Sequence, residues 1–189
     1  MKFEVKNKQP VSGTLNFERI TFNINNKMQK AIFLDRDGVL INDAGQYYIY
    51  ETDDIIINNG VIDALKKFTD MGFLLIVISN QGGIAKQIYT KEDVEKIHSE
   101  LKKQFEIEGI DIKEYYYCPH HSDVEKCLCR KPEPLLIEKA LARFNIDPNK
   151  SFMIGDNKRD VDAGKRVGLS CIKIKPNQNL LDILPHINA

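Results

Sequence analysis

From residue 31 onward, short apolar runs alternate with stretches in which apolar residues recur at helical spacing. A continuous apolar run of four to eight residues is typical of a strand buried on both faces, and apolar residues three or four positions apart indicate one face of a helix. The pattern predicts strands at 31–35, 73–80, 112–118, 151–156 and 171–175, and helices at 61–71, 90–105, 136–144 and 161–167. Because parallel strands need crossover connections, this alternation predicts an α/β fold whose parallel sheet has helices on both faces.

Two of the predicted helices carry end signals. Gly72 follows the helix at 61–71, where glycine commonly ends a helix. Thr90 and Asp93 have the spacing of a capping box at the start of the helix at 90–105. His98 falls inside that helix, and we expect it at the surface.

Residues 1–30 have a different character. They are polar and rich in Asn and Lys, and a single alternating stretch at 15–24 predicts a strand there. We assign 1–30 to an N-terminal extension of unknown role and 31–189 to a single domain, because a chain of 189 residues can bury one substantial core.

The composition is that of an ordinary soluble globular protein, with 42% hydrophobic and 29% charged residues. The longest apolar run, 73–78, is too short to span a bilayer, and no basic segment followed by an apolar stretch opens the chain, so we expect a cytoplasmic protein without a membrane partner. The net charge is zero, with 27 basic and 27 acidic residues, which argues against nucleic-acid binding and favours a small substrate.

Polar chemistry gathers where the predicted strands end, and ligands bind at the carboxyl ends of strands in such sheets. Asp35, Asp37 and Asp156 would meet there, and three neighbouring carboxylates repel one another unless a cation lies between them. Oxygen ligands favour Mg2+, which in turn favours a phosphorylated substrate. The donors expected to contact phosphate oxygens are Ser79, the amides of Asn80 and Gln81, Arg130 and Lys131.

The loop at 118–132 contains three of the four cysteines in the chain. Cys118, His120, Cys127 and Cys129 form a C-x-H and C-x-C pattern, which suits tetrahedral Zn2+ in a closed structural site. A chance cluster of reduced cysteines, a redox pair and a disulfide are the alternatives. His121 is the alternative histidine ligand, and we expect it to lie in the loop or face the substrate.

Four segments in order resemble the motifs of the haloacid dehalogenase-like (HAD) phosphatases: "FLDRDGVL", "VISN", "CRKP" and "IGDNKRD". The resemblance covers residues 31 to about 176, and it implies a Rossmann-like sheet. It also implies that Asp35 attacks phosphorus to form an aspartyl-phosphate, with Asp37 as general acid and base. Ser79 and Lys131 would hold the phosphoryl group.

The same resemblance implies a Mg2+ site made of Asp35, the backbone carbonyl of Asp37, and Asp156. Asp160 would orient a water at that metal.

The zinc loop narrows the resemblance to two related groups, the heptose 1,7-bisphosphate phosphatases and the histidinol-phosphate phosphatases. Both groups contact substrate through loops without a large cap domain, and the intervals at 40–58 and 80–90 are too short to hold one. "SNQGGIAKQIYT" and "NDAGQYYIYETDDI" resemble the heptose group more closely. The resemblance therefore implies a phosphatase that removes the 7-phosphate of D-glycero-D-manno-heptose 1,7-bisphosphate for lipopolysaccharide or surface-layer glycan synthesis. We expect it to be a monomer. Histidinol phosphate is the alternative substrate.

Overall fold

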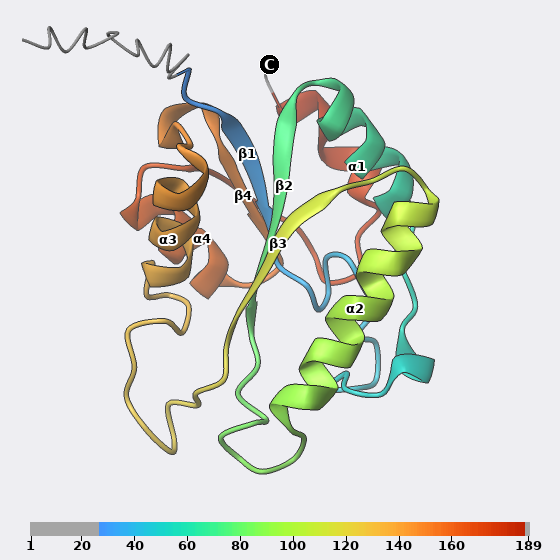
Figure 1. The fold of residues 1–189 in the computed structure, drawn as a ribbon, viewed down its shortest axis with the longest axis vertical. Coiled ribbons are helices and arrows are strands. Elements are labelled where there is room, and N and C mark those ends of the chain that lie inside the picture. Colours follow the sequence, from blue (N-terminus) through green and yellow to red (C-terminus); the bar gives the residue numbers. More distant parts are fainter. Residues whose placement is uncertain (1–26, 188–189) are drawn as a thin grey trace, which may run out of the picture.

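The computed structural model describes residues 27–187, so the strand expected at 15–24 lies outside the described part of the chain. Its centre is a five-stranded sheet in the order β3-β2-β1-β4-β5, with every neighbouring pair parallel (Figure 1). The predicted parallel sheet is confirmed. The strands are β1 (Lys30–Leu34), β2 (Phe73–Asn80), β3 (Ile112–Cys118), β4 (Phe152–Gly155) and β5 (Ser170–Lys173).

Helices cover both faces of this sheet. In Figure 1, α1 and α2 lie on one side of the sheet and α3 and α4 on the other. The helices are α1 (Val61–Asp70), α2 (Lys91–Ile107), α3 (Leu135–Phe144) and α4 (Lys158–Arg166), with short 3-10 turns at Thr52–Asp54, Pro148–Lys150 and Leu180–His186. No helix within residues 27–187 has the length and apolar character needed to cross a bilayer.

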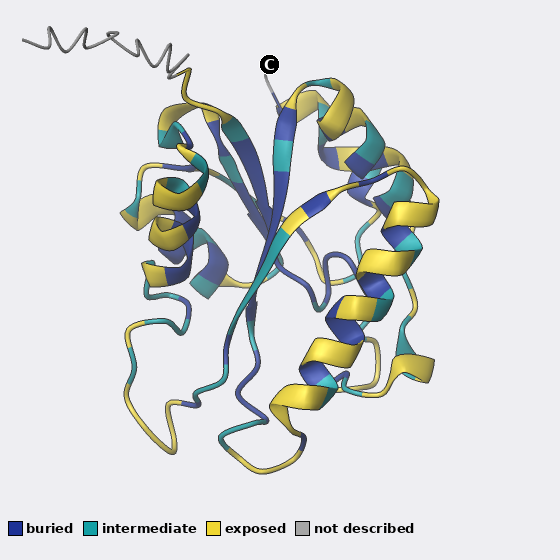
Figure 2. Ribbon diagram, in the orientation of Figure 1, coloured by how far each residue is buried: buried dark blue, intermediate teal, exposed yellow. Residues whose placement is uncertain are grey.

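The two apolar cores follow from the alternation of side chains along the central strand. Ile32 and Leu34 face the core beneath α1 and α2, whereas Ala31 and Phe33 face the core beneath α3 and α4. All four side chains are fully buried. Burial of each larger apolar side chain stabilises the fold by roughly 1.5–3 kcal/mol. Figure 2 shows β1 and β2 mostly buried, β3 mostly intermediate, and the outward faces of the helices exposed.

Helix α2 begins as the sequence predicts. The Thr90 hydroxyl accepts a hydrogen bond from the backbone N–H of Asp93, and the Asp93 carboxylate accepts one from that of Thr90. The surface position expected for His98 is wrong, because its ring is 8% exposed and stacks on Tyr115 with 5.0 Å between ring centroids. His98 lies next to Ile97 on the helix stripe that faces β3.

Helix α4 begins at Lys158, three residues before the predicted start. Asn157 caps it by accepting from the Arg159 backbone N–H, while Asp160 accepts from the Asn157 backbone N–H. This second capping box was not part of the sequence prediction. It fixes the first turn of α4 beside the carboxyl end of β4.

Register brings the carboxyl ends of the inner strands together at one edge. Leu34 of β1 pairs with Val77 of β2 and Ile154 of β4. The loop after β1 then turns at Gly38, which has a φ of +75°. A side chain there would bring its Cβ within 2.8 Å of Asp156 Oδ2, so only glycine lets this loop approach Asp156 so closely.

Candidate functional site

The strand ends surround a cavity of about 470 Å3. Its walls come from the loop after β1, the end of β2 with the loop beyond it, the cysteine loop and the start of α4. The residues lining it are Asp35, Asp37, Asp43, Gly45, Gln46, Tyr47, Tyr48, Ile49, Ser79, Asn80, Gln81, Gly82, Tyr89, His121, Arg130, Asp156, Asn157 and Arg159. All the predicted magnesium ligands and all the predicted phosphate donors except Lys131 line this one cavity.

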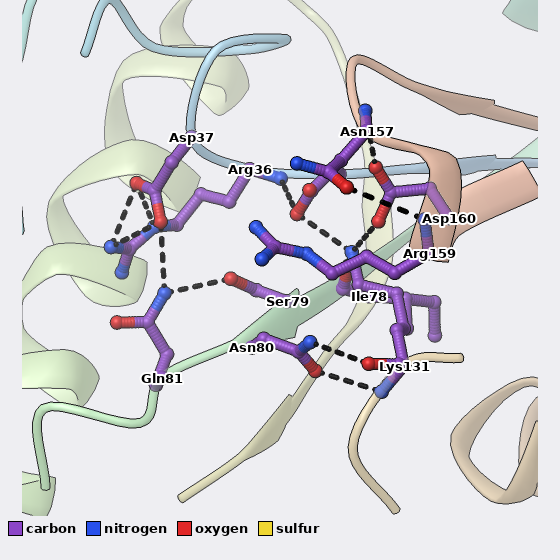
Figure 3. Close-up of polar contacts among 11 residues, drawn as sticks. Arg36, Asp37, Ile78, Ser79, Asn80, Gln81, Lys131, Asn157, Arg159 and Asp160 are labelled. Carbon is purple, nitrogen blue, oxygen red and sulfur yellow. Dashed lines mark hydrogen bonds and ion pairs between the residues drawn. The ribbon is translucent and has the colours of Figure 1, made fainter. Parts of the chain in front are cut away.

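Lys131 lies beneath the cavity, and it is 2% exposed. Its Nζ contacts Asp35 Oδ1 at 2.9 Å and Asp160 Oδ1 at 2.8 Å, and it donates to the carbonyl oxygen of Ile78 at 2.6 Å (Figure 3). Burial alone would lower the pKa of Lys131, but Asp160 and Asp35 outweigh that effect and raise it. Lys131 is therefore a fixed, charged ammonium beside Asp35.

Asp35 follows β1 directly, and its backbone N–H donates to Ile154 of β4 at 3.0 Å. Burial raises the pKa of its carboxyl to about 7, and the Asp160 carboxylate adds to the increase while Lys131 opposes it. A cation beside Asp35 would counter this and keep the carboxyl ionised at neutral pH.

Asp37 is held at one side of the cavity by two neighbours (Figure 3). Arg36 donates to both of its carboxylate oxygens, at 2.9 and 3.0 Å, and the Gln81 amide donates to Oδ2 at 3.0 Å. The Gln81 amide also donates to the Ser79 hydroxyl at 2.7 Å and accepts from the Tyr89 hydroxyl at 2.8 Å. This network positions a carboxyl group that remains part-exposed on the cavity wall.

Sequence reasoning missed the roles of Arg36 and Tyr89. Arg36 is fully buried and also donates to the Ile49 carbonyl at 2.9 Å. An arginine two positions after a buried strand is expected in a turn. The spacing of apolar residues around Arg36 does not indicate that its side chain points inward. The position of Tyr89 near Gln81 could not be seen either, because the connecting loop has no repeating pattern.

The Asn80 side chain has a different set of contacts from those expected of a phosphate donor. Its amide nitrogen donates to the Lys131 carbonyl at 3.0 Å, and its amide oxygen accepts from the Lys131 backbone N–H at 2.9 Å. These two bonds tie the cysteine loop to the end of β2. The substrate-binding roles assigned to Asn80 and Gln81 remain predictions, with both side-chain amides engaged within the protein.

Of the three carboxylates predicted to meet, Asp35 and Asp156 belong to one group, in which Asp160 takes the place expected for Asp37. One oxygen from each of Asp35, Asp156 and Asp160 lies within 4.8 Å of the others. Burial raises the pKa of Asp156, and the carboxylates of Asp160 and Asp43 raise it further. An all-oxygen donor set with excess negative charge fits a hard divalent cation such as Mg2+. Asp43, in a loop without a strand-end position, escaped the sequence analysis.

Asp160 is the third carboxylate of this group, and both of its oxygens have partners within the protein. One of its oxygens faces Lys131 and the other accepts from the Asn157 backbone N–H. The structure thus gives Asp160 an ion pair and a helix cap, whereas the role expected from the resemblance was orientation of a water.

The cysteine loop gathers Cys118, His120, Cys127 and Cys129 with their ligand atoms within 4.8 Å of one another. Five of the six separations between these atoms range from 3.1 to 3.7 Å. A tetrahedron with metal–sulfur bonds of about 2.3 Å has edges of about 3.8 Å, and a disulfide would require about 2.05 Å between sulfur atoms. All four cysteines are free. The grouping therefore fits Zn2+, which would replace the thiol protons of side chains such as Cys118.

His121 is not part of this group. Its Nδ1 accepts from the Asp123 backbone N–H at 3.2 Å, and its ring lines the cavity. Cys118, which ends β3, pairs with Asn80 of β2, and its carbonyl accepts from the Gln81 backbone N–H at 2.7 Å. The four candidate zinc ligands are thereby attached directly to the end of the sheet.

A tyrosine cluster forms the outer part of the cavity. Tyr48 and Tyr50 each contact the Tyr89 ring, with centroid separations of 5.6 and 5.3 Å, and Tyr47 is 83% exposed beside Tyr48. Tyr47, Tyr48 and Tyr89 line the cavity. The apolar ring faces and phenol groups suit a polar small molecule with a carbon skeleton.

Comparison with known proteins adds sequence relatives to this geometry. A family model described as "HAD-hyrolase-like" matches residues 128–182. The chain is 41% identical over 143 residues to D-glycero-beta-D-manno-heptose-1,7-bisphosphate 7-phosphatase from Pasteurella multocida, covering 73% of this chain and 77% of the relative. It is 38% identical over 143 residues to the protein of that name from Escherichia coli K12, covering 72% of this chain and 74% of the relative.

Solved structures with the same fold include D,D-heptose 1,7-bisphosphate phosphatase from B. bronchiseptica complexed with magnesium and phosphate. That structure has a TM-score of 0.72 and 26% sequence identity, and the match covers 83% of this chain and 86% of the other. A putative HAD-like phosphatase from Mesorhizobium loti has a TM-score of 0.75 at 24% identity, covering 85% of this chain and 86% of the other.

Proposed function

Because the chain belongs to the D-glycero-beta-D-manno-heptose-1,7-bisphosphate 7-phosphatase family, we propose that it hydrolyses the 7-phosphate of D-glycero-D-manno-heptose 1,7-bisphosphate. The observation that carries the proposal is the buried Asp35 carboxylate, paired with Lys131 at the end of β1 and flanked by Asp37 on the cavity wall.

In the first half of the reaction, an Asp35 oxygen forms a bond to phosphorus while the bond from phosphorus to the sugar oxygen breaks. Asp37 in its acid form donates a proton to the departing oxygen, so the sugar leaves as an alcohol. Arg36 and Gln81 hold the Asp37 carboxyl at the cavity wall for this transfer.

In the second half, Asp37 as carboxylate takes a proton from water while the water oxygen attacks phosphorus. The bond from phosphorus to Asp35 breaks, which releases phosphate and returns both carboxyl groups to their starting states. Lys131 and Ser79 neutralise and orient the phosphoryl oxygens in both halves. The contacts of Lys131 to Asp35, Asp160 and Ile78 fix its ammonium before substrate arrives.

Two metals complete the proposal. Asp35, Asp156 and the backbone carbonyl of Asp37 would hold Mg2+, which supplies positive charge against the phosphate oxygens when bound. Cys118, His120, Cys127 and Cys129 would hold a structural Zn2+ that orders the loop leading to Arg130 and Lys131.

The sugar bisphosphate is favoured over histidinol phosphate by the names of the relatives with about 40% identity. We infer that the enzyme works as a cytoplasmic monomer on a soluble sugar phosphate and supplies heptose for lipopolysaccharide or a related glycan.

A substrate panel tests the proposal. Purified protein with Mg2+ should release phosphate from the heptose 1,7-bisphosphate with a kcat/KM at least about 100-fold above that for histidinol phosphate, a margin within ordinary enzyme discrimination. Faster release from histidinol phosphate would overturn the substrate assignment while leaving the phosphatase chemistry intact.

A further inference from the structure

Arg159 projects into the cavity from the first turn of α4. It precedes Asp160, and the Asn157 cap that accepts its backbone N–H fixes the direction in which the helix starts. Figure 3 shows its side chain running from α4 toward the side of the site that holds Asp37 and Gln81. Its guanidinium therefore belongs to the wall of the same cavity as the reacting carboxylates.

The Arg159 guanidinium has no protein partner among residues 27–187. No hydrogen bond or ion pair involves it there, and its Nε is buried without a hydrogen-bond partner. The other described arginines each have a protein partner: Arg36 pairs with Asp37, Arg143 with Glu114 and Arg166 with Glu133, and Arg130 donates to the carbonyl oxygen of His120 at 2.9 Å. An unpaired buried donor costs free energy, so a ligand acceptor is expected to satisfy it.

Arg159 lines the same cavity as Asp35 and Asp156, and no ion pair to a carboxylate among residues 27–187 neutralises its guanidinium. It stays available to an anion that enters the cavity.

The phosphate that reacts at Asp35 already has dedicated donors. Lys131 lies beneath that position with 2% exposure, whereas Arg159 is half-buried on the wall. A cavity of about 470 Å3 lies within the size range of small-molecule sites. A second phosphate on the same sugar needs its own cation, and the planar fork of arginine matches phosphate oxygens.

We propose that Arg159 binds the 1-phosphate of the substrate and so sets the preference for a sugar bisphosphate over a sugar monophosphate. This inference rests on the proposed function. It identifies the residue that binds the phosphate group which the enzyme does not cleave.

The test compares two substrates that differ only in the 1-phosphate, heptose 1,7-bisphosphate and heptose 7-phosphate. Arg159→Ala should lower kcat/KM for the bisphosphate by about 10- to 100-fold, mainly through KM, the size expected for a lost charge-assisted contact. Its loss on the 7-phosphate should be far smaller. Equal losses on both substrates, or no loss on either, would overturn the inference.

Two further variants separate a binding role from a folding role. Lys158→Ala is the matched control, because Lys158 is the preceding residue, is exposed, and pairs with Asp162 outside the cavity. It should leave both substrates within about twofold of wild type. Arg159→Lys keeps the charge without the fork, and should recover part of the bisphosphate selectivity. Selectivity as low in Arg159→Lys as in Arg159→Ala would contradict a charge-based contact.

Direct binding of the product heptose 1-phosphate, measured by calorimetry, requires no turnover. Its Kd should rise at least about 10-fold in Arg159→Ala, and an unchanged Kd would overturn the role of Arg159. Failure of the wild-type protein to hydrolyse the bisphosphate would instead overturn the proposed function. The comparison of Kd values would still decide whether Arg159 binds a sugar 1-phosphate.

Discussion

At the scale of single residues, the site is a set of charges that the fold holds in place before any ligand enters. The Lys131 ammonium lies between Asp35 and Asp160, both of which are almost fully buried. Fixed charges in a site shielded from water act on a reacting phosphate more strongly than mobile ones do, since no reorganisation is needed during the reaction. Each of these residues can be tested separately.

Replacing the proposed nucleophile is the most direct test. Asp35→Asn should abolish phosphate release, because an amide of the same size cannot form the aspartyl-phosphate. The fold should persist, with a circular dichroism spectrum like that of wild type. Asp63→Asn, in the exposed first turn of α1, is the control. Activity that survives in Asp35→Asn would mean that another group attacks phosphorus.

Asn80 tests whether an amide at this site binds substrate or positions another residue. Since both polar atoms of its side chain bond to the Lys131 backbone, Asn80→Ala should lower kcat by about 10-fold or more through misplacement of that lysine. KM should change little. A variant with normal kcat and a greatly raised KM would restore the direct substrate role.

At the scale of elements, strands and helices were predictable because their apolar periods are strong. The predicted ranges, 73–80 for β2 and 112–118 for β3, agree with the structure at both ends. Loops carried less information. Asp35 and Asp156 could be predicted because each follows a buried strand, whereas Asp43 and Tyr89 lie in segments without a period.

His98 is a polar residue on the apolar face of α2. It is four residues after Val94 and three before Leu101, both buried in α2, so its place on the apolar stripe was present in the pattern. Position on the stripe decides its burial, although histidine is more often found at the surface. Arg36 differs, because only the folded path of the loop after β1 turns its side chain inward.

The proposed zinc site in the cysteine loop can be tested by metal content and by thermal stability. Wild-type protein should contain about one Zn per chain by elemental analysis. Cys127→Ser should lower that content and reduce the melting temperature by roughly 5 °C or more, since metal binding orders a loop with little buried apolar surface. Activity should fall with it, because Asn80 alone would then hold the Lys131 backbone in place.

Cys171 supplies the matched control, since it lies on β5 outside the cluster. Cys171→Ala should keep the Zn content of wild type. Full retention of Zn after replacing Cys127 and Cys129 together would contradict a site closed by four protein ligands.

At the scale of the whole molecule, two cores share one sheet, and the stability of the fold depends on groups buried between layers. His98 is such a group, held between α2 and β3 with its Nε2 lacking a hydrogen-bond partner among residues 27–187. Burial lowers the pKa of His98 to about 3, and the positive charge of Arg36 adds to that effect. The folded protein therefore keeps this ring neutral where the unfolded chain would protonate it.

The pH dependence of unfolding follows from that difference. Between pH 6.5 and pH 3 the unfolded chain binds a proton at His98 that the folded protein does not, so stability falls as the pH falls. From pH 7 to pH 5, wild type should lose about 2 kcal/mol of unfolding free energy more than His98→Phe. Urea titrations at both pH values measure this. Parallel losses in the two proteins would show that His98 does not contribute.

The tyrosine cluster has a consequence for how substrate preference can change over time. Tyr47 and Tyr48 lie on the loop after β1, whereas the reacting carboxylates lie at strand ends and Lys131 follows the cysteine loop. Mutations at the exposed Tyr47 can therefore accumulate without disturbing the sheet, whereas a change at Tyr48 would reach the Asp37 carboxyl through Tyr89 and Gln81. A graft at 44–47 that keeps Tyr48 in place would therefore change the wall that faces the sugar and leave the groups that act on phosphorus as they are.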